Sequence, residues 1–389
     1  MQITLRQLFT VIVVISLLLC LTQAEGCGAS VHRIGSISFS PDGKLIALAR
    51  FDARDARTPG KGYLRDVSRT ISVVDAATGR QLKTVQQDSR YGNCGPAFGL
   101  FGYSRGDLAF AHNDRLFIRE FGGGPVDVYE VSTDSRSQFT KEEFAEIAIC
   151  KDGSFLVAVL FEEIRVFPLT QNQNPIIRSF PNTRAFAFSP RFWLCENSLA
   201  TRAADGHSFW DLESGQAIDR VEETEGHNVH NLVLWEENRL VAFSDSEGSL
   251  YFADRSKSEK PKRLASKILR HTLRKLPNSD LLAYVTHEPV RSLMPGARGY
   301  SLALQDPIEG DLRTFPLPGY PTSVTFSRDG STVALGDSRG QLTLMELQNG
   351  RVVWTTKPAG RYRLPWTVPT LLLVLLFCWH VRPWKAGAK

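Results

Sequence analysis

The sequence has little cysteine and lacks short motifs that mark several catalytic and metal-binding classes. Its 389 residues include six cysteines, and no Cys-x-x-Cys pair or clustered Cys/His spacing occurs, so we expect no zinc site. A phosphate-binding loop and a His-Glu-x-x-His motif are absent as well. The formal net charge of +5 is mild, whereas a globally basic nucleic-acid binder would be more one-sided. We therefore expect no catalytic residue, no cofactor, no metal and no nucleic-acid partner.

The N-terminal end of the chain is apolar. Residues 1–24 carry Arg6, then an apolar stretch, and end in the small residue Ala24, which is the pattern of a cleaved secretory signal peptide. A buried first helix and an uncleaved anchor are the alternatives. A cleaved signal would place the rest of the folded chain outside the cytoplasm.

A second apolar run lies near the C-terminal end. Residues 364–381 are flanked by Trp366, Trp379 and basic residues, which is typical of a transmembrane helix. A C-terminal strand or a peripheral helix is the alternative. We expect a linker over residues 358–363 before the helix and a short cytoplasmic tail over residues 382–389 after it. Together the two ends predict a single-pass membrane protein with its folded domain on the extracytoplasmic side.

Between the ends, short alternating runs are separated by tight turns, most clearly in residues 320–356. The first run, Thr-Ser-Val-Thr-Phe-Ser, has the period-two pattern of a half-buried strand. Asp329 and Gly330 then predict a turn, because Asp can bond its own backbone and Gly can take a positive φ. Three more runs follow, separated by Asp-Ser-Arg-Gly and Gln-Asn-Gly. Four antiparallel strands of this size cannot cover their own faces, so we expect neighbouring copies.

The first unit, after the N-terminal segment, repeats this arrangement. An alternating run over residues 34–40 leads to Pro-Asp-Gly, and a third strand over residues 70–75 leads to Ala-Thr-Gly. The order of strand, Ser-Pro-Asp-Gly, strand, strand and Thr-Gly resembles the WD-repeat β-propeller family. The resemblance implies a ring of four-stranded blades that works by protein–protein interaction, although function does not follow from fold alone.

Ten residues carry this family pattern. We expect them at turns and strand ends, in structural roles: Asp42, Gly43, Asp205, Gly206, Trp210, Asp211, Gly226, His227, Asp329 and Gly330. The group Asp205, His207 and Ser208 could also be read as a catalytic triad. An Asp-Gly turn before a third strand is a structural feature of the family, so we favour the structural interpretation.

Units of this kind fill residues 31–357, and we count seven. Their first turns are expected at Gly43, Gly106, Gly153, Arg191, Asn238, Ser279 and Gly330, close to the family spacing of about 40–45 residues once insertions are allowed for. The second unit is expected over residues 98–131, and insertions over residues 51–69 and 288–298. We therefore predict an all-β fold, a seven-bladed β-propeller of four-stranded antiparallel blades. Six or eight blades are the alternatives, and a two-sheet β-sandwich fits so many repeating four-strand sets poorly.

Four of the six cysteines lie between the apolar runs. Outside the cytoplasm such residues can form disulfides. On a propeller, Cys27 and Cys94 would both precede a first strand in adjacent units, and Cys150 and Cys195 would both lie at or after the end of one. We hypothesise the pairs Cys27–Cys94 and Cys150–Cys195, with four buried thiols as the alternative.

The most basic stretch of the chain spans residues 255–275 and contains a single acid, Glu259. The cations that could contact an anionic partner are Lys257, Lys260, Lys262, Arg263, Lys267, Arg270, Arg274 and Lys275. The stretch lacks interleaved aromatics, which disfavours single-stranded nucleic acid. It could meet anionic headgroups, an acidic glycan or an acidic protein. A solvated edge strand protected by lysines explains the pattern as well.

These features favour a membrane-tethered scaffold that binds an unidentified protein partner through blade-edge loops. In a propeller, both chain ends would leave from the face with the second-to-third-strand and fourth-to-first-strand loops. Residues 357–363 span at most about 25 Å, so that face would lie near the bilayer and the other would be open to a partner. A small-molecule ligand is not expected. The alternatives are an exported propeller enzyme, such as a lactonase or a quinone-dependent dehydrogenase, and a protein that binds glycans or anionic surfaces.

Overall fold

The computed structural model describes much of the chain between residues 31 and 356. The described residues are 31–57, 63–92, 108–112, 114–119, 124–144, 146–150, 153–160, 163–169, 178–181, 192–195, 198–203, 206–222, 229, 231–235, 239–257, 260–269, 272–289 and 298–356. The predicted signal peptide, linker, transmembrane helix and tail lie outside them. Within the described ranges, no helix is long and apolar enough to cross a membrane.

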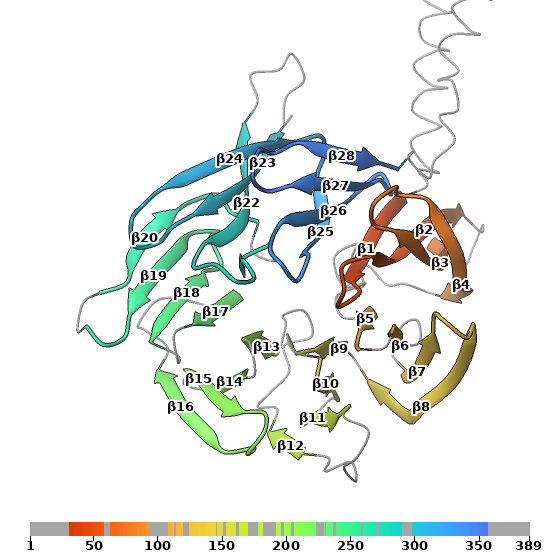
Figure 1. The fold of residues 1–389 in the computed structure, drawn as a ribbon, viewed down its shortest axis with the longest axis horizontal. Helices are drawn as coiled ribbons and strands as arrows, with labels where there is room; N and C mark the ends of the chain where they lie inside the picture. The colour runs from red at the N-terminus through yellow and green to blue at the C-terminus, as the bar shows by residue number, and fades with distance from the viewer. Residues whose placement is uncertain are drawn as a thin grey trace, which may run out of the picture.

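The described strands form seven separate four-stranded antiparallel sheets. In each sheet the strands follow one another in chain order, so every sheet is an uninterrupted meander. Figure 1 shows the seven sheets arranged as blades around a central opening, with first strands near the centre and fourth strands at the rim. The prediction of an all-β, seven-bladed propeller is therefore confirmed.

The strand bounds, blade by blade, are as follows. Blades 1 to 3 contain β1 (Val31–Phe39), β2 (Leu45–Arg57), β3 (Tyr63–Asp75) and β4 (Gln81–Gly92); β5 (Leu108–Phe110), β6 (Arg115–Arg119), β7 (Gly124–Glu130) and β8 (Ser135–Phe144); and β9 (Glu146–Ile149), β10 (Phe155–Val159), β11 (Glu163–Pro168) and β12 (Arg178–Pro181). Blades 4 and 5 contain β13 (Phe192–Cys195), β14 (Ser198–Ala203), β15 (Gly206–Asp211) and β16 (Ala217–Glu222); and β17 (Asn231–Trp235), β18 (Leu240–Ser244), β19 (Leu250–Asp254) and β20 (Lys262–Ala265). Blades 6 and 7 contain β21 (Arg274–Lys275), β22 (Leu282–Pro289), β23 (Arg298–Gln305) and β24 (Leu312–Leu317); and β25 (Pro321–Phe326), β26 (Thr332–Asp337), β27 (Leu342–Glu346) and β28 (Val352–Thr355).

The insertion predicted over residues 51–69 is largely strand. β2 continues to Arg57 and β3 begins at Tyr63, and the two strands pair along their whole length. Its sequence is rich in Asp and Arg and carries no sustained apolar alternation, so the strands were not recognised. The prediction of a loop there was wrong.

Blade 2 lies one strand further along the chain than predicted. Its described strands begin with β5, turn at Asp114 with a φ of 55°, and end with β8 at Phe144 rather than near residue 131. β8 is a rim strand that is polar and mostly exposed, so its sequence does not alternate and was not recognised. Counting from Gly106 therefore placed the first turn too early. The turn predicted at Arg191 is also wrong, because that residue precedes β13, the first strand of blade 4, and the first turn lies between β13 and β14.

The hydrophobic core lies between the blades. Seven clusters of buried apolar side chains each join two neighbouring blades of the described chain. In the cluster that closes the ring, Ile34 and Val74 of blade 1 pack with Ala334 and Leu342 of blade 7. Each blade is thus completed by its neighbours, as expected for a sheet too small to bury both its faces. In the described chain, blades 1 and 7 exchange no strand.

Candidate functional site

The first strands of the blades surround a central channel. It is a cavity of about 520 Å³ lined by described residues from all seven blades. We call the face of the disc with the first-to-second-strand and third-to-fourth-strand turns the turn face, and the opposite face the loop face. First-to-second-strand turns contribute Pro41, His112, Gly153, Pro277 and Arg328 to the channel wall. The channel therefore reaches the turn face.

Polar side chains of the first strands join neighbouring blades around the channel. Three hydrogen bonds link blades 7 and 1, 1 and 2, and 5 and 6: Thr322 Oγ1 donates to the Ile34 carbonyl at 2.5 Å, the Phe110 amide donates to Ser38 Oγ at 3.0 Å, and Asn231 Nδ2 donates to the Leu273 carbonyl at 3.0 Å. Buried hydrogen bonds of this kind fix the positions of the strands that make them. These bonds therefore hold the first strands together at three of the seven interfaces between blades.

Charge is unevenly distributed around the channel. Arg274 and Lys275 of β21 and Arg328 of the β25–β26 turn lie in two neighbouring blades. Glu146 of β9 is the single acid among the described residues that line the cavity, and it belongs to blade 3 on another side of the ring (Figure 1). The wall formed by blades 6 and 7 is therefore positive.

Arg274 occupies an unusual environment for a guanidinium. Its side chain is accessible from the channel, yet the ring of blades encloses it, and this desolvation lowers its pKa while attraction from Glu146 acts in the opposite direction. Its Nη1 donates to the neighbouring Leu273 carbonyl at 2.8 Å. A guanidinium keeps its charge in proteins even so. Arg274 therefore places an accessible positive charge inside the channel.

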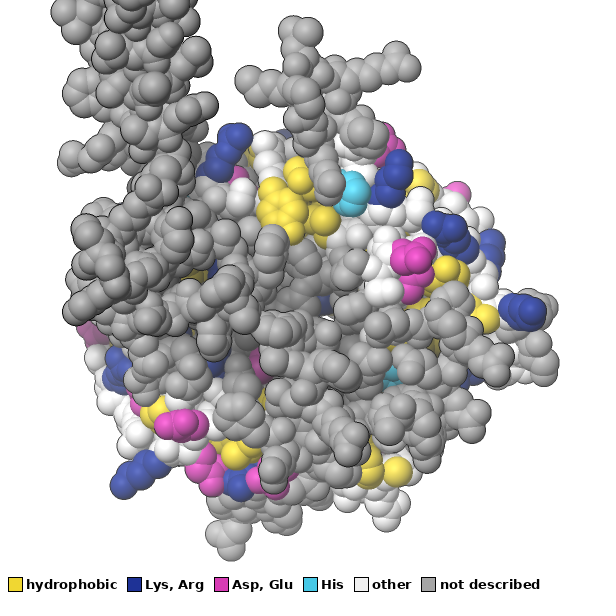
Figure 2. All heavy atoms as spheres, turned by 180° about the vertical axis from the view of Figure 1, so that it is seen from behind, with side chains coloured by type: hydrophobic (Ala, Val, Ile, Leu, Met, Phe, Trp, Pro, Cys, Tyr) yellow, Lys and Arg dark blue, Asp and Glu magenta, His cyan; other side chains and the backbone are white. Residues whose placement is uncertain are grey.

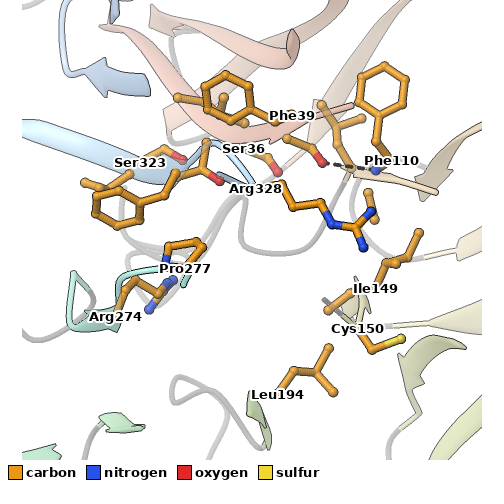
Figure 3. Close-up of a pocket in the computed structure, with 18 of the residues that line it drawn as sticks. Ser36, Phe39, Phe110, Ile149, Cys150, Leu194, Arg274, Pro277, Ser323 and Arg328 are labelled. Carbon is orange, nitrogen blue, oxygen red and sulfur yellow. Dashed lines mark hydrogen bonds between the residues drawn. The ribbon is translucent and has the colours of Figure 1, made fainter. Parts of the chain in front are cut away.

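Arg328 is positioned by its own turn and by the turn of the next blade. The Asn278 side chain donates to the Arg328 carbonyl at 3.2 Å, which links the first turns of blades 6 and 7. Its side chain is exposed and extends into the open centre of the ring (Figure 3). The backbone is thus held while the guanidinium is available to a ligand.

Two of the Asp-Gly motifs, Asp42–Gly43 and Asp329–Gly330, lie in turns, where the Asp side chains accept hydrogen bonds from the turn itself. Ser40 Oγ and the Lys44 amide both donate to Asp42 Oδ1, at 2.7 and 3.0 Å, and Gly43 has a φ of 73°. Burial alone would raise the pKa of Asp42, but these hydrogen bonds and the Lys44 ammonium lower it. Asp329 repeats the arrangement, and hydrogen bonds led by that from Ser327 lower its pKa. Both carboxylates are occupied by their own turns.

The Trp-Asp ending of β15 also has structural contacts. Trp210 Nε1 donates to Thr201 Oγ1 of the adjacent strand at 2.9 Å, and Asp211 accepts the Ser214 amide at 2.5 Å. His207 is buried, and Ser208 follows it in the same strand, so the two side chains point to opposite faces of the blade. They cannot act together on one ligand. Asp205, Gly226 and His227 lie outside the described residues, and Gly206 opens β15.

Residues 336–340 read Gly-Asp-Ser-Arg-Gly, which has the Gly-x-Ser-x-Gly spacing of a nucleophile elbow. A nucleophile elbow joins a strand to a helix, whereas these residues join β26 to β27 in a hairpin. Asp337 Oδ1 accepts the Arg339 and Gln341 amides at 2.8 Å each. The spacing is therefore that of an Asp-stabilised turn. In the described ranges, no three His, Cys, Asp or Glu side chains could hold a metal ion together.

The cysteines of blades 3 and 4 lie where the sequence placed them. Cys150 directly follows β9, is buried, and accepts the Phe155 amide at 3.0 Å through Sγ. Cys195 ends β13, the corresponding strand of the next blade. The Cys150–Cys195 disulfide stays a prediction, as does Cys27–Cys94, whose two residues lie outside the described ranges.

The basic stretch is divided between two places. Lys262 and Arg263 belong to β20, the rim strand of blade 5, and the nearby cations on this rim are Lys257, Lys260 and Lys267, all exposed. Figure 2 shows Lys and Arg side chains along the edge of the disc on the side of blades 5 and 6. Arg274 and Lys275 instead line the channel, and Arg270 lies outside the described residues. The described residues therefore do not form one continuous basic patch.

Sequence reasoning did not single out Arg328, Glu146 or His112 as residues of a common site. Arg328 carried a usable signal, because it precedes the Asp-Gly of a first turn and such turns border the channel. Glu146 carried no such signal, because the sequence does not show which side chains of its strand face the centre of the ring. Arg328, Glu146 and His112 line one cavity only because the blades close into a ring.

These observations define a seven-bladed β-propeller with a basic central channel. The β-propeller domain of Cps50 (Swd1) from Myceliophteria thermophila is similar to this chain with a TM-score of 0.50 and 11% identity, over 84% of this chain and 96% of that one. A chain of the mitotic checkpoint complex is similar with a TM-score of 0.49 and 13% identity, over 67% and 78%. Dihydro-heme d1 dehydrogenase NirN in complex with DHE has a TM-score of 0.48 and 16% identity, over 85% and 68%. No family model matches the sequence, and no curated protein matches it. At these identities the similarity concerns the fold alone.

Proposed function

We propose that this chain is a WD-type propeller that serves as a binding platform for a protein partner, tethered to a membrane by its C-terminal apolar segment. The propeller lies on the extracytoplasmic side, after removal of residues 1–24. The two apolar ends of the sequence support the tether and the side. The fold is compatible with a scaffold, since propellers present loops from many blades on a rigid disc.

The observation that carries the binding role is the construction of the turn face. Its first turns are braced internally by Asp42 and Asp329, and those of blades 6 and 7 are tied together by Asn278. Lys44 and Asn278 themselves are exposed on this face. A preorganised surface loses little conformational entropy when a partner binds. The turns of the loop face are braced in the same way by Asp245 and Asp337. We assign docking to the turn face because β1 begins and β28 ends at the loop face, which the tether would hold near the membrane.

Site-specific photo-crosslinking in native membranes tests the proposal. A crosslinking amino acid replaces Lys44 or Asn278 on the turn face of the full-length chain, and Glu247 or Arg339 on the loop face in matched controls; all four are exposed. We expect the two turn-face positions to capture the same protein and the loop-face positions not to capture it. Alkaline extraction should leave the full-length chain with the membrane.

Four outcomes would contradict parts of this proposal. Capture of the same partner mainly from Glu247 and Arg339 would move the docking surface to the loop face. Absence of a reproducible partner from all four positions would end the scaffold role. Release of the chain by alkaline extraction would contradict the membrane tether. A mature chain that begins at Met1 would contradict cleavage of the signal peptide.

A further inference from the structure

The positive wall of the channel is formed by residues of blades 6 and 7. Arg274 and Arg328 lie in neighbouring blades and both line the cavity. Within the described residues, neither guanidinium forms an ion pair. Glu146 also lines the cavity and attracts Arg274, but the described lining carries three cations, Arg274, Lys275 and Arg328, against this one acid. The arrangement therefore favours a negatively charged ligand.

Neutral donors accompany the two guanidinium groups. Ser36 of β1 and Ser323 of β25 line the same cavity beside blade 7 (Figure 3). Their hydroxyl groups make no hydrogen bond to other described residues, so both can donate to a ligand oxygen. Guanidinium and hydroxyl donors together match the oxygen atoms of a carboxylate or phosphate group.

The remaining wall of the channel mixes polar and apolar side chains. The apolar ones come from four blades and also pack against the clusters between blades: Phe39, Phe110, Ile149 and Leu194 (Figure 3). The polar ones include His112, Asn231 and Thr322. Small-molecule sites in proteins usually have volumes of about 300–1,000 Å³, with mainly apolar walls and a few placed polar groups. The cavity of about 520 Å³ falls in this range. A ligand with an apolar body as well as an anionic group would use both parts of the wall.

We propose that the channel is a binding site for an organic anion, a carboxylate or phosphate ester with an aromatic or aliphatic body. Arg274 and Arg328 bind the anionic group, Ser36 and Ser323 donate further hydrogen bonds, and the apolar wall holds the body. Ser36, Arg274 and Ser323 belong to first strands that surround the centre of the ring, whereas Arg328 belongs to a first turn, so the channel opens beside the proposed docking face.

The test is a titration of the full-length protein in detergent with benzoate and phenyl phosphate, followed by calorimetry at low salt. Benzamide, which has the same ring without the charge, is the ligand control. The channel variant carries Arg274→Gln and Arg328→Gln. The rim variant carries Lys262→Gln and Arg263→Gln, which remove two exposed cations from β20 and keep the net charge equal to that of the channel variant.

We expect saturable binding of both anions and none of benzamide. The Kd should rise at least about tenfold in the channel variant, because each lost charged hydrogen bond is worth about that factor or more. The rim variant should retain the original Kd. Circular dichroism and thermal unfolding check folding, and the channel variant should be as stable as the parent protein because neither side chain bonds to another blade.

The proposal is overturned by any of three results. Binding that weakens equally in both variants would show a non-specific effect of net charge. Binding that weakens only in the rim variant would place the anion site on β20. Failure of either anion to bind saturably up to about 10 mM, a concentration that detects Kd values near 1 mM, would mean that the channel is not a site for this class of ligand.

Discussion

Among single residues, Tyr284 of β22 is a buried phenol that has a hydrogen-bond partner in the core. Its side chain is 1% exposed, and its hydroxyl donates to Gln305 Oε1 at 2.6 Å. Burial raises the pKa of Tyr284 to about 12, because the phenolate would lose its hydration. The phenol therefore stays protonated in the folded protein at pH values where an unfolded chain releases the proton.

This leads to a prediction for alkaline pH. The folded-state pKa lies above the unfolded value of about 10, so the stabilisation is complete below pH 10 and is lost as the pH rises toward 12. The loss could reach about 2.7 kcal/mol, from two pK units at about 1.36 kcal/mol each. Tyr284→Phe should remove this contribution and cost about 1–2 kcal/mol at neutral pH, since Gln305 loses a partner.

Urea unfolding at pH 8 and pH 11 measures both effects. The gap in unfolding free energy between the parent protein and Tyr284→Phe should shrink or reverse at pH 11. Other groups titrate in both proteins alike, so the difference isolates Tyr284. A gap that stays constant between the two pH values would refute the assignment.

At the scale of elements, equivalent turns of different blades face different surroundings. Gly330 in blade 7 has a φ of 72°, and a Cβ there would lie 2.5 Å from the Pro277 carbonyl oxygen of blade 6. Gly43 in blade 1 has a φ of 73°, but a Cβ there would meet nothing within 4 Å. The two positions separate backbone strain from contact between blades.

We predict that the two alanine substitutions differ in their effect on stability. Gly43→Ala should cost about 1–2 kcal/mol, the strain of a left-handed conformation. Gly330→Ala should cost about 1–3 kcal/mol more, since the neighbouring turn must move. Urea unfolding of the two variants tests this, and equal losses would indicate that the turns of blades 6 and 7 are not packed as described.

Elements whose structure is specified by neighbouring residues in the sequence could be predicted, and elements without such a local pattern could not. The turns at Gly43, Gly153 and Gly330 were predicted correctly because Asp, Gly and Ser specify them locally. β8 and the outer part of the β2–β3 hairpin were missed because polar strands carry no apolar period.

The channel residues were beyond prediction for a different reason. Arg274 and Arg328 are 54 positions apart in sequence and line one cavity only because blades 6 and 7 are neighbours in a closed ring. Arg274 was predicted as part of a continuous basic stretch, and no local pattern distinguishes it from the exposed cations of β20. Which side chains face the centre is decided by the register of each first strand in the assembled disc.

At the scale of the whole molecule, the seam between blades 7 and 1 differs from the other six. No chain connection crosses it, so side chains hold it together. Trp354 Nε1 donates to the Ala76 carbonyl at 2.8 Å, and Thr322 Oγ1 donates to the Ile34 carbonyl. Both bonds join residues more than 270 positions apart. The indole also packs on the cluster that closes the ring.

We predict that Trp354→Phe loosens this seam selectively. Loss of the indole donor should cost about 1–2 kcal/mol. Trp210→Phe is the matched control, since Trp210 donates within blade 4. Hydrogen exchange should rise in blades 1 and 7 for Trp354→Phe and in blade 4 for Trp210→Phe. The same exchange pattern in both variants would mean that the seam is no weaker than the rest of the disc.

The uninterrupted meander of each blade has a mechanical consequence. In a ring whose two end blades shared a sheet, separating the ends would require breaking backbone hydrogen bonds along a strand. Here the first and last sheets are each complete among the described strands. Tension between the two ends of the chain would therefore first separate blade 1 from blade 7. The ring would open into an arc of seven intact blades before any sheet lost its backbone hydrogen bonds.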